Sequence, residues 1–239
     1  MRWLICIDDT DNEDSIGTGK LARQLGASLQ ERRLVSGEIS VTRHQLLVHP
    51  DIPYTSHNSS ACIEAQSAEE RDTLLDAARD YLKQHEHPGA NPGLCVVAAD
   101  AVPPALVAIG RAAQREVLDL NAFDEQIREM DLALWCSGTT GQGRIGACSG
   151  VALRSTGEDG RFIGLRGIRD LEGRLSVAEI CDRSGVVAVR TEDGEFLDAD
   201  VMIDTGDWVR PTLIGRRPVL LVRDDGGRWV PAARRSKDD

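Results

Sequence analysis

The sequence has no apolar run that could cross a membrane, because a spanning helix needs about 20 consecutive apolar residues and no stretch comes near that length. It also lacks the basic start and the cleavage site of a secretory signal peptide, and opens instead on a strand-like segment. Hydrophobic residues make up 41% of the 239 residues, enough to bury the core of one large domain or two ordinary ones. We therefore expect a cytoplasmic protein without a membrane partner.

Closely spaced cysteine pairs are also lacking. None of the six cysteines forms a CxxC pair, and most lie in apolar segments: Cys6, Cys62, Cys95, Cys136, Cys148 and Cys181. Isolated cysteines of this kind are far more often buried thiols than disulfide partners or zinc ligands. The sequence therefore predicts free thiols.

A net positive charge is the third absence, since the formal net charge is -11. A broad nucleic-acid footprint needs clustered Lys and Arg, so the acidic balance disfavours RNA as a partner without excluding it. Residues 144–174 are the exception, with six arginines against four acidic residues. A solvated mixed surface is the simpler explanation of any single arginine in that stretch.

Acidic residues, in contrast, gather directly after the first predicted strand. The apolar segment 3–7 is followed by five acidic residues within 8–14, and then by the Gly-Thr-Gly-Lys segment 17–20. Such crowding of carboxylates is unfavourable unless a cation offsets it, and Mg²⁺ that carries nucleotide phosphates is the usual cation at the end of a strand. A glycine-flanked helix start supplies backbone N–H groups and a dipole that favour phosphate. We predict a metal and phosphate loop here.

Two other acidic or phosphate-binding templates do not fit this loop. An EF-type calcium loop would need glycine at Asp14 and glutamate at Lys20. A Walker A loop would need glycine at Asp14 and Ser or Thr at Leu21. A third template, the aspartyl phosphatase, stays open: Asp9 would be its nucleophile and Asp11 its acid, although Glu13 replaces the customary Thr or Val.

Two later segments could face this loop. The stretch 49–62 is stiffened by prolines and ends in short polar side chains, among them Asn58, which could contact a ligand. The stretch 139–147 is rich in glycine and carries Arg144, which could pair with phosphate. A plain loop and a tightly packed helix are the competing explanations.

The hydrophobic pattern of the first hundred residues predicts the order β-α-β-β-α-β, typical of a split βαβ or a related α/β sandwich. We expect Ser15 to cap the first helix and Ser67 with Glu70 to form a capping box on the second. Near residue 134 the composition changes to Ser, Thr and Gly, which predicts two domains, 1–133 and 134–239. In the second domain, strands at 186–191 and 197–203 are expected to pair around Asp193-Gly194.

Taken in order, several motifs resemble the archaeal agmatinylcytidine synthetase family, which modifies an anticodon cytidine of an isoleucine tRNA. They are Asp8-Asp9-Thr10-Asp11, Ile52-Pro53-Tyr54-Thr55 with Asn58, Asn91-Pro92-Gly93, Gly143-Arg144-Ile145-Gly146-Ala147 and Pro211-Thr212-Leu213-Ile214-Gly215-Arg216. The resemblance implies an α/β (α+β) fold, with an N-terminal kinase-like domain that binds ATP and Mg²⁺ and a ferredoxin-like domain after it. It implies that Asp8, Asp9 and Asp11 hold the metal and that Thr18 faces the γ-phosphate. The OB-fold and the zinc ribbon of the family have no counterpart within these residues.

These observations predict an enzyme that uses ATP and Mg²⁺ to activate an acceptor by phosphoryl or nucleotidyl transfer. The acidic net charge favours an acceptor other than unaided tRNA. The predicted catalytic residues are Asp8, Asp9, Asp11 and Thr18, and the predicted nucleotide contacts are Gly17, Gly19, Lys20, Asn58 and Arg144. A nucleotide-binding regulatory module without turnover and an aspartate-nucleophile phosphohydrolase are the alternatives.

Overall fold

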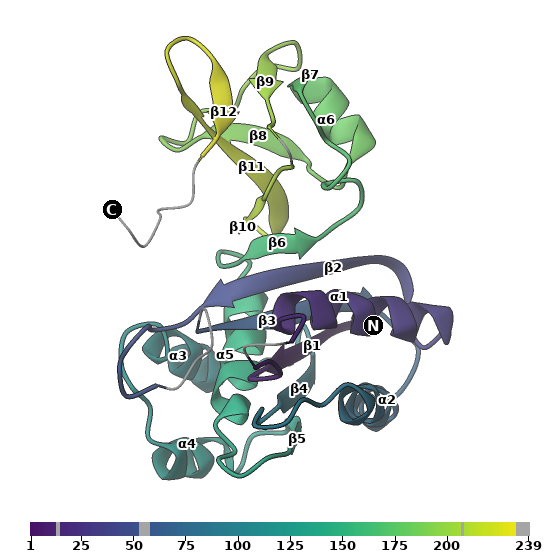
Figure 1. The fold of residues 1–239 in the computed structure, drawn as a ribbon, viewed down its shortest axis with the longest axis vertical. Coiled ribbons are helices and arrows are strands. Elements are labelled where there is room, and N and C mark those ends of the chain that lie inside the picture. The colour runs from purple at the N-terminus through teal and green to yellow at the C-terminus, as the bar shows by residue number, and fades with distance from the viewer. Residues whose placement is uncertain (13–14, 53–57, 207, 233–239) are drawn as a thin grey trace.

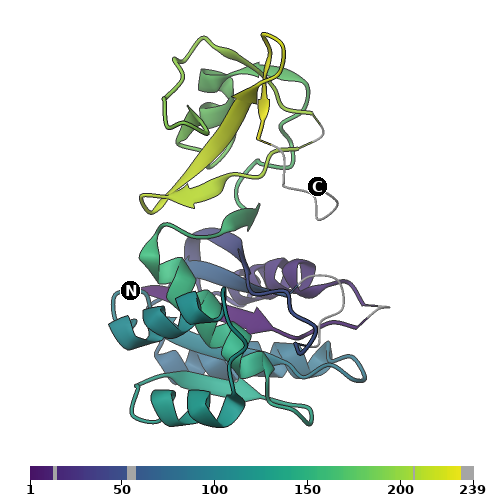
Figure 2. The ribbon, with the colours of Figure 1, turned by 90° about the vertical axis from the view of Figure 1, so that its left-hand side faces the viewer.

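The computed structural model describes residues 1–12, 15–52, 58–206 and 208–232. Within these residues the chain has a mixed α/β fold with six helices and a 12-stranded sheet. The strands follow the order β5-β4-β1-β3-β2-β6-β10-β11-β12-β9-β7, and β8 pairs with β11. Figures 1 and 2 show a C-terminal part, built mostly of strands, stacked on an N-terminal part that carries most of the helices.

The N-terminal part has five antiparallel strands between two layers of helices. The strands are β1 (Arg2–Asp8), β2 (Ser36–Gln45), β3 (Ser59–Gln66), β4 (Gly93–Ala98) and β5 (Ala133–Cys136). One face packs on α1 (Thr18–Glu31) and α2 (Arg71–Gln84). The other face packs on α3 (Pro104–Ala112), α4 (Leu120–Ile127) and α5 (Gly143–Thr156).

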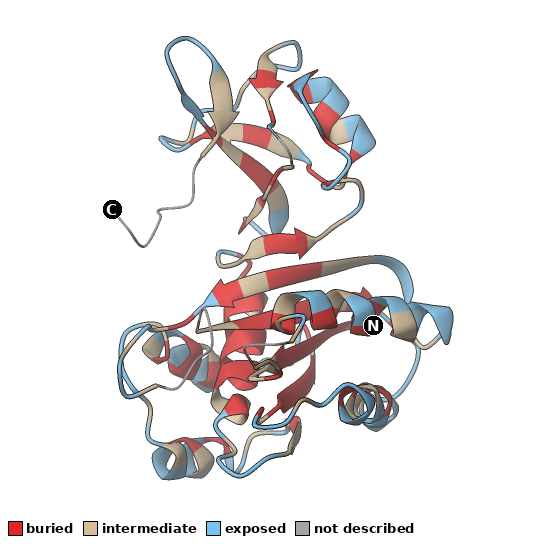
Figure 3. Cartoon of the chain, in the orientation of Figure 1, coloured by how far each residue is buried: buried red, intermediate tan, exposed pale blue. Residues whose placement is uncertain are grey.

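β1 is apolar on both faces because both are covered. Ile5 and Ile7 pack on the side of α1 and α2, whereas Leu4 and Cys6 pack on the side of α5. Figure 3 accordingly shows the central strands and α5 as the most buried elements. The β-α-β-β-α-β order predicted for the first hundred residues is confirmed.

The C-terminal part surrounds a third apolar core, which includes Phe162, Ile180 and Leu220. Its elements are β6 (Arg161–Gly164), β7 (Arg174–Ser176), α6 (Val177–Arg183), β8 (Ala188–Thr191), β9 (Met202–Asp204), β10 (Thr212–Ile214), β11 (Arg217–Asp224) and β12 (Trp229–Pro231). β6 pairs with β2 on one side and with β10 on the other, so it joins this part to the N-terminal sheet.

Two local predictions are wrong, and a third is confirmed only in part. Gly17, with φ 79°, is the N-cap of α1 in place of Ser15, whose hydroxyl bonds within the preceding loop. No capping box forms at α2, because the N-cap is Glu70 and not Ser67; the Ser67 hydroxyl donates instead to the carbonyl of Leu34. The hairpin predicted around Asp193-Gly194 forms at its turn end, where Arg190 bridges Phe196 and the Leu197 N–H donates to the Val189 carbonyl, but β9 pairs with β7 and β12 and not with β8.

The six cysteines carry free thiols, as predicted. None of the described helices combines the length and the apolar character that crossing a bilayer requires.

Candidate functional site

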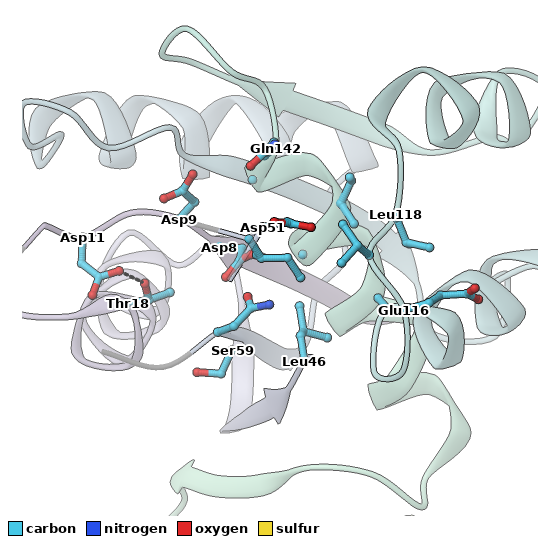
Figure 4. A pocket seen from close by; sticks show the side chains of 17 residues that line it. Asp8, Asp9, Asp11, Thr18, Leu46, Asp51, Ser59, Glu116, Leu118 and Gln142 are labelled. Carbon is cyan, nitrogen blue, oxygen red and sulfur yellow. Dashed lines mark hydrogen bonds between the residues drawn. The ribbon is translucent and has the colours of Figure 1, made fainter. Parts of the chain in front are cut away.

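A cavity opens at the end of β1, where the loop after β1 meets α1, the β2–β3 connection, the segment after α3 and the start of α5 (Figure 4). It encloses about 780 Å³ of empty space, its mouth included. Five predicted site residues line it: Asp8, Asp9, Asp11, Thr18 and Asn58. Folding therefore brings the acidic loop and the β2–β3 connection to one place.

Asp8 ends β1 and lies against the first turns of α5. A Cβ atom added at Gly146 would overlap the carboxyl group of Asp8, so the absence of a side chain at this position lets the helix approach the strand. Burial, reinforced by repulsion from Asp9 and Asp11, raises the pKa of Asp8 to about 8. Near neutral pH the carboxyl group therefore keeps a proton unless a cation takes its place.

Asp9 has a φ of 52°, a left-handed conformation that costs free energy in residues other than glycine and clusters at functional sites. Its carbonyl accepts a hydrogen bond from the backbone N–H of Asn91 at 3.1 Å, which holds the turn in place. Burial and the charge of Asp11 raise the pKa of Asp9 to about 7. The loop thus stores both strain and unfavourable charge.

Asn91 also ties a second loop to this turn. Its side-chain oxygen accepts hydrogen bonds from the backbone N–H groups of Thr139 and Thr140, at 2.8 and 3.0 Å. Asn91 therefore connects the segment between β5 and α5 to the loop that carries Asp9.

Asp11 is held by the first residue of α1. The Thr18 hydroxyl donates to the Asp11 carboxylate at 2.8 Å and accepts from the Thr10 hydroxyl at 3.0 Å. Figure 4 shows Asp11 and Thr18 together at one side of the cavity. The buried Thr18 hydroxyl is thus engaged within the protein, where it orients Asp11.

The remaining predicted phosphate contacts lie outside the cavity lining. A Cβ atom on Gly19 would meet Ile163, and Lys20 is exposed. Gly17 is the N-cap of α1 and is not among the described residues that line the cavity. Arg144 pairs with Asp124 on α4 at 3.0 Å and is also absent from the lining. The roles of these residues in nucleotide binding stay predictions.

Asn58 lies in the lining, and its side-chain amide donates to the carbonyl of Leu47 at 2.6 Å. The neighbouring motif residues 53–57, and residues 13 and 14 of the acidic loop, lie outside the described part of the chain.

The two segments expected to face the loop, 49–62 and 139–147, both contribute to the lining, whereas Leu46 and the segment after α3 were not predicted. One wall is apolar and includes Leu46, Leu118 and Ile145, and two further carboxylates, Asp51 and Glu116, also line the cavity. No Lys or Arg occurs among the described lining residues. The segment after α3 that supplies Glu116 carries no motif, so only its position in the fold reveals it.

The donor set suits a hard cation that keeps part of its coordination for other ligands. Among the described residues, no group of three or more His, Cys, Asp or Glu side chains is close enough to hold a metal. Mg²⁺ usually takes one or two carboxylates and completes its octahedron with water and phosphate oxygens. The carboxylates of Asp8 and Asp9, whose pKa values are raised chiefly by burial and also by neighbouring carboxylates, fit this pattern.

No protein-family model matches the chain, and no curated protein matches it. Solved structures do. A tRNA fluorescent labeling enzyme is 26% identical with a TM-score of 0.53, over 64% of this chain and 36% of that chain. A complex of TiaS with its isoleucine tRNA, AMPCPP and agmatine is 25% identical with a TM-score of 0.51, over 63% of this chain and 36% of that chain.

A structure of apo TiaS, a tRNA agmatidine synthetase, is 24% identical with a TM-score of 0.54, over 64% of this chain and 35% of that chain. This chain therefore spans about a third of the length of the solved structures that it matches. The similarity expected from the motifs is confirmed as a shared fold over about two thirds of this chain.

Proposed function

We propose that the chain binds ATP with Mg²⁺ in the cavity at the end of β1 and uses it to activate an acceptor. The observation that carries the proposal is the placement of Asp8, Asp9 and Asp11 in one cavity beside the start of α1. These acids are unfavourable without a cation, and a nucleotide–metal complex supplies one. The similarity to a structure that contains AMPCPP supports the assignment.

In this proposal Asp8, Asp9 and Asp11 hold the metal, directly or through water. When bound, Mg²⁺ neutralises charge on the phosphates during transfer. Thr18 orients Asp11 through its hydroxyl. The first backbone N–H groups of α1 follow a cap that makes no side-chain bond, so they are placed to bind a phosphate oxygen.

The acceptor oxygen would attack the γ- or the α-phosphorus, and ADP or pyrophosphate would leave. The apolar wall with Leu46, Leu118 and Ile145 suits a planar base. Asp51 and Glu116 suit a second substrate with positive charge. We therefore propose an RNA base as the acceptor and an amine as the group that displaces the phosphate, in line with the tRNA and agmatine in the TiaS complex.

We further propose a kinase-like N-terminal domain and a ferredoxin-like element beyond it, as the resemblance implies. The division at residue 134 stays a prediction, and the packing of β5 on β4 and of α5 on β1 supports a later division. A division between Thr156 and Arg161 would leave these elements with the cavity that α5 helps to line.

The experiment is a calorimetric titration of the protein with ATP, with and without Mg²⁺, followed by product analysis. We expect Mg²⁺-dependent binding that Asp9→Asn weakens at least about tenfold, or about 1.4 kcal/mol. Asp193→Asn, an exposed acid in a turn of the C-terminal part, is the matched control. Equal affinity with and without Mg²⁺ would contradict the proposal, and a trapped aspartyl phosphate on Asp9 would favour the phosphohydrolase.

A further inference from the structure

A second cavity lies in the C-terminal part, among β6, β10, β11 and β12. It encloses about 1180 Å³ of empty space, its mouth included. Its charged lining mixes both signs: Arg161, Arg210 and Arg228 with Glu192, Asp204 and Asp225. The function proposed for the first cavity makes no use of these residues.

Two arginines in this region are arranged on one aromatic ring. The guanidinium group of Arg210 lies 3.9 Å from the ring centroid of Trp208, and that of Arg169 lies 4.5 Å from it. A cation–π contact of this kind holds a guanidinium group in place without neutralising its charge. The ring of Trp208 therefore holds the guanidinium groups of both Arg169 and Arg210 in place before any ligand arrives.

The positive charges crowd one another. Burial and the charge of Arg210 lower the pKa of Arg161, and burial and the charge of Arg169 lower the pKa of Arg23 on α1. In the described part of the chain, Arg23, Arg161 and Arg169 take part in no ion pair. Like charges gathered in this way favour an anionic ligand, and guanidinium groups match phosphate in particular.

One strand, β2, connects this arginine cluster to the first cavity. Arg161 on β6 is paired in register with Arg43 on β2. Three residues after Arg43, a separation of about 10 Å along an extended chain, Leu46 lines the first cavity. A ligand that spans this distance could reach both places.

We infer that Arg161, Arg169 and Arg210, with Trp208, bind the phosphates of an RNA strand and hold it beside the cavity that contains Asp8. The inference rests on the proposed function, in which an RNA base is the acceptor. The first cavity is lined by carboxylates and repels the RNA backbone, so the backbone needs a separate positive surface while one base enters. An exposed strand with splayed bases meets this need.

The test is a fluorescence-anisotropy titration of a labelled RNA stem–loop, repeated between about 50 and 200 mM KCl. We expect the Arg161→Gln/Arg169→Gln double variant to bind at least about tenfold more weakly. We also expect the slope of log K against log salt to fall by about two, one for each lost phosphate contact. Arg111→Gln, which removes an exposed charge from α3 on the opposite face of the sheet, should leave both quantities unchanged.

Unchanged RNA affinity and salt slope in the double variant would overturn the inference. So would displacement of the RNA by inorganic phosphate or AMP at matched phosphate concentration, because the site would then serve small anions. If circular dichroism shows that the double variant is unfolded, Arg169→Gln, at an exposed position, should lower the slope by about one. ATP titrations separate the two proposals. If the arginine variants bind both ATP and RNA as the wild type does, only this inference is contradicted. If the wild type does not bind ATP, the proposed function is contradicted.

Discussion

At the scale of single residues, the site is defined by carboxyl groups that the fold holds in an unfavourable state. Asp8 and Asp9 have pKa values raised to about 8 and about 7, chiefly by burial. Asp9 also has a φ of 52°. A fold that needed only stability would not retain these features, and their presence at one cavity is what a bound cation would explain.

The raised pKa of Asp8 predicts how the stability of the metal-free protein depends on pH. A carboxyl group whose pKa is 3.8 when unfolded and about 8 when folded binds its proton more tightly in the folded state. The free energy of unfolding therefore falls as pH rises from about 4 toward 8. We expect the free energy of unfolding in urea to fall by about 3–4 kcal/mol more in the wild type than in Asp8→Asn between pH 5 and pH 8.

Addition of Mg²⁺ with ATP should raise the free energy of unfolding at pH 8 again in the wild type, and should not do so in the Asp8→Asn variant. A wild type whose stability is the same at both pH values would show that the carboxyl group is not destabilised by its surroundings.

Gly146 tests the packing of α5 against Asp8. A methyl group at this position would overlap the Asp8 carboxyl group, so Gly146→Ala should reduce ATP affinity at least about tenfold. The matched control is Gly150→Ala, one turn further along α5, where the methyl group would meet Cys6 and Ser60. Both variants should lose about 1–3 kcal/mol of stability, but only Gly146→Ala should lose ATP binding by calorimetry.

At the scale of elements, the start of α1 links the acidic loop to the helix. The Thr18 hydroxyl bridges Thr10 and Asp11, so the side chain of the first helical residue orients a proposed metal ligand. The predicted Ser15 cap is wrong because Gly17 takes the positive φ that the chain needs to enter the helix. The sequence pattern located the helix, whereas the cap depended on the path of the loop.

Substitution of Thr18 separates its hydroxyl from its position in the helix. Thr18→Ala should weaken ATP binding in the presence of Mg²⁺ by about tenfold, because Asp11 loses the bond that orients it. Thr18→Ser keeps the hydroxyl and should retain most of the affinity. Equal affinities for the two variants in calorimetric titrations would assign no role to this hydrogen bond.

At the scale of the whole molecule, β6 connects two hydrophobic cores. It pairs with β2 and with β10, and Phe162 lies in the C-terminal core beneath the guanidinium group of Arg154 from α5, 5.0 Å from the ring centroid. Phe162→Ala should lower the stability of the molecule by about 3–5 kcal/mol. We expect both parts to unfold together in this variant.

Tryptophan fluorescence can follow each part separately, since Trp3 and Trp135 lie in the N-terminal part and Trp208 and Trp229 in the C-terminal part. Urea transitions of variants that keep only one of these pairs should have the same midpoint and shift together with Phe162→Ala. Separate midpoints would show that β6 does not couple the two parts.

The net charge of the whole chain was a poor guide to RNA binding. A net charge of -11 disfavoured RNA, but a charged ligand responds to the local distribution of charge on a surface. Arg169 and Arg210 are 41 positions apart in the sequence, and their contact with the ring of Trp208 forms only on folding. The total charge therefore gives no measure of what this surface can bind.

The sequence by itself determined the β-α-β-β-α-β order and the acidic loop at the end of β1, because both depend on neighbours along the chain: hydrophobic periodicity and a run of carboxylates. Only the tertiary structure decided what faces that loop. It brought Glu116 and Gly146 to the cavity and turned Arg144 toward Asp124. These positions depend on how α3 and α5 pack on the sheet. Packing brings together residues that are far apart along the chain, and no local sequence pattern predicts which residues will meet.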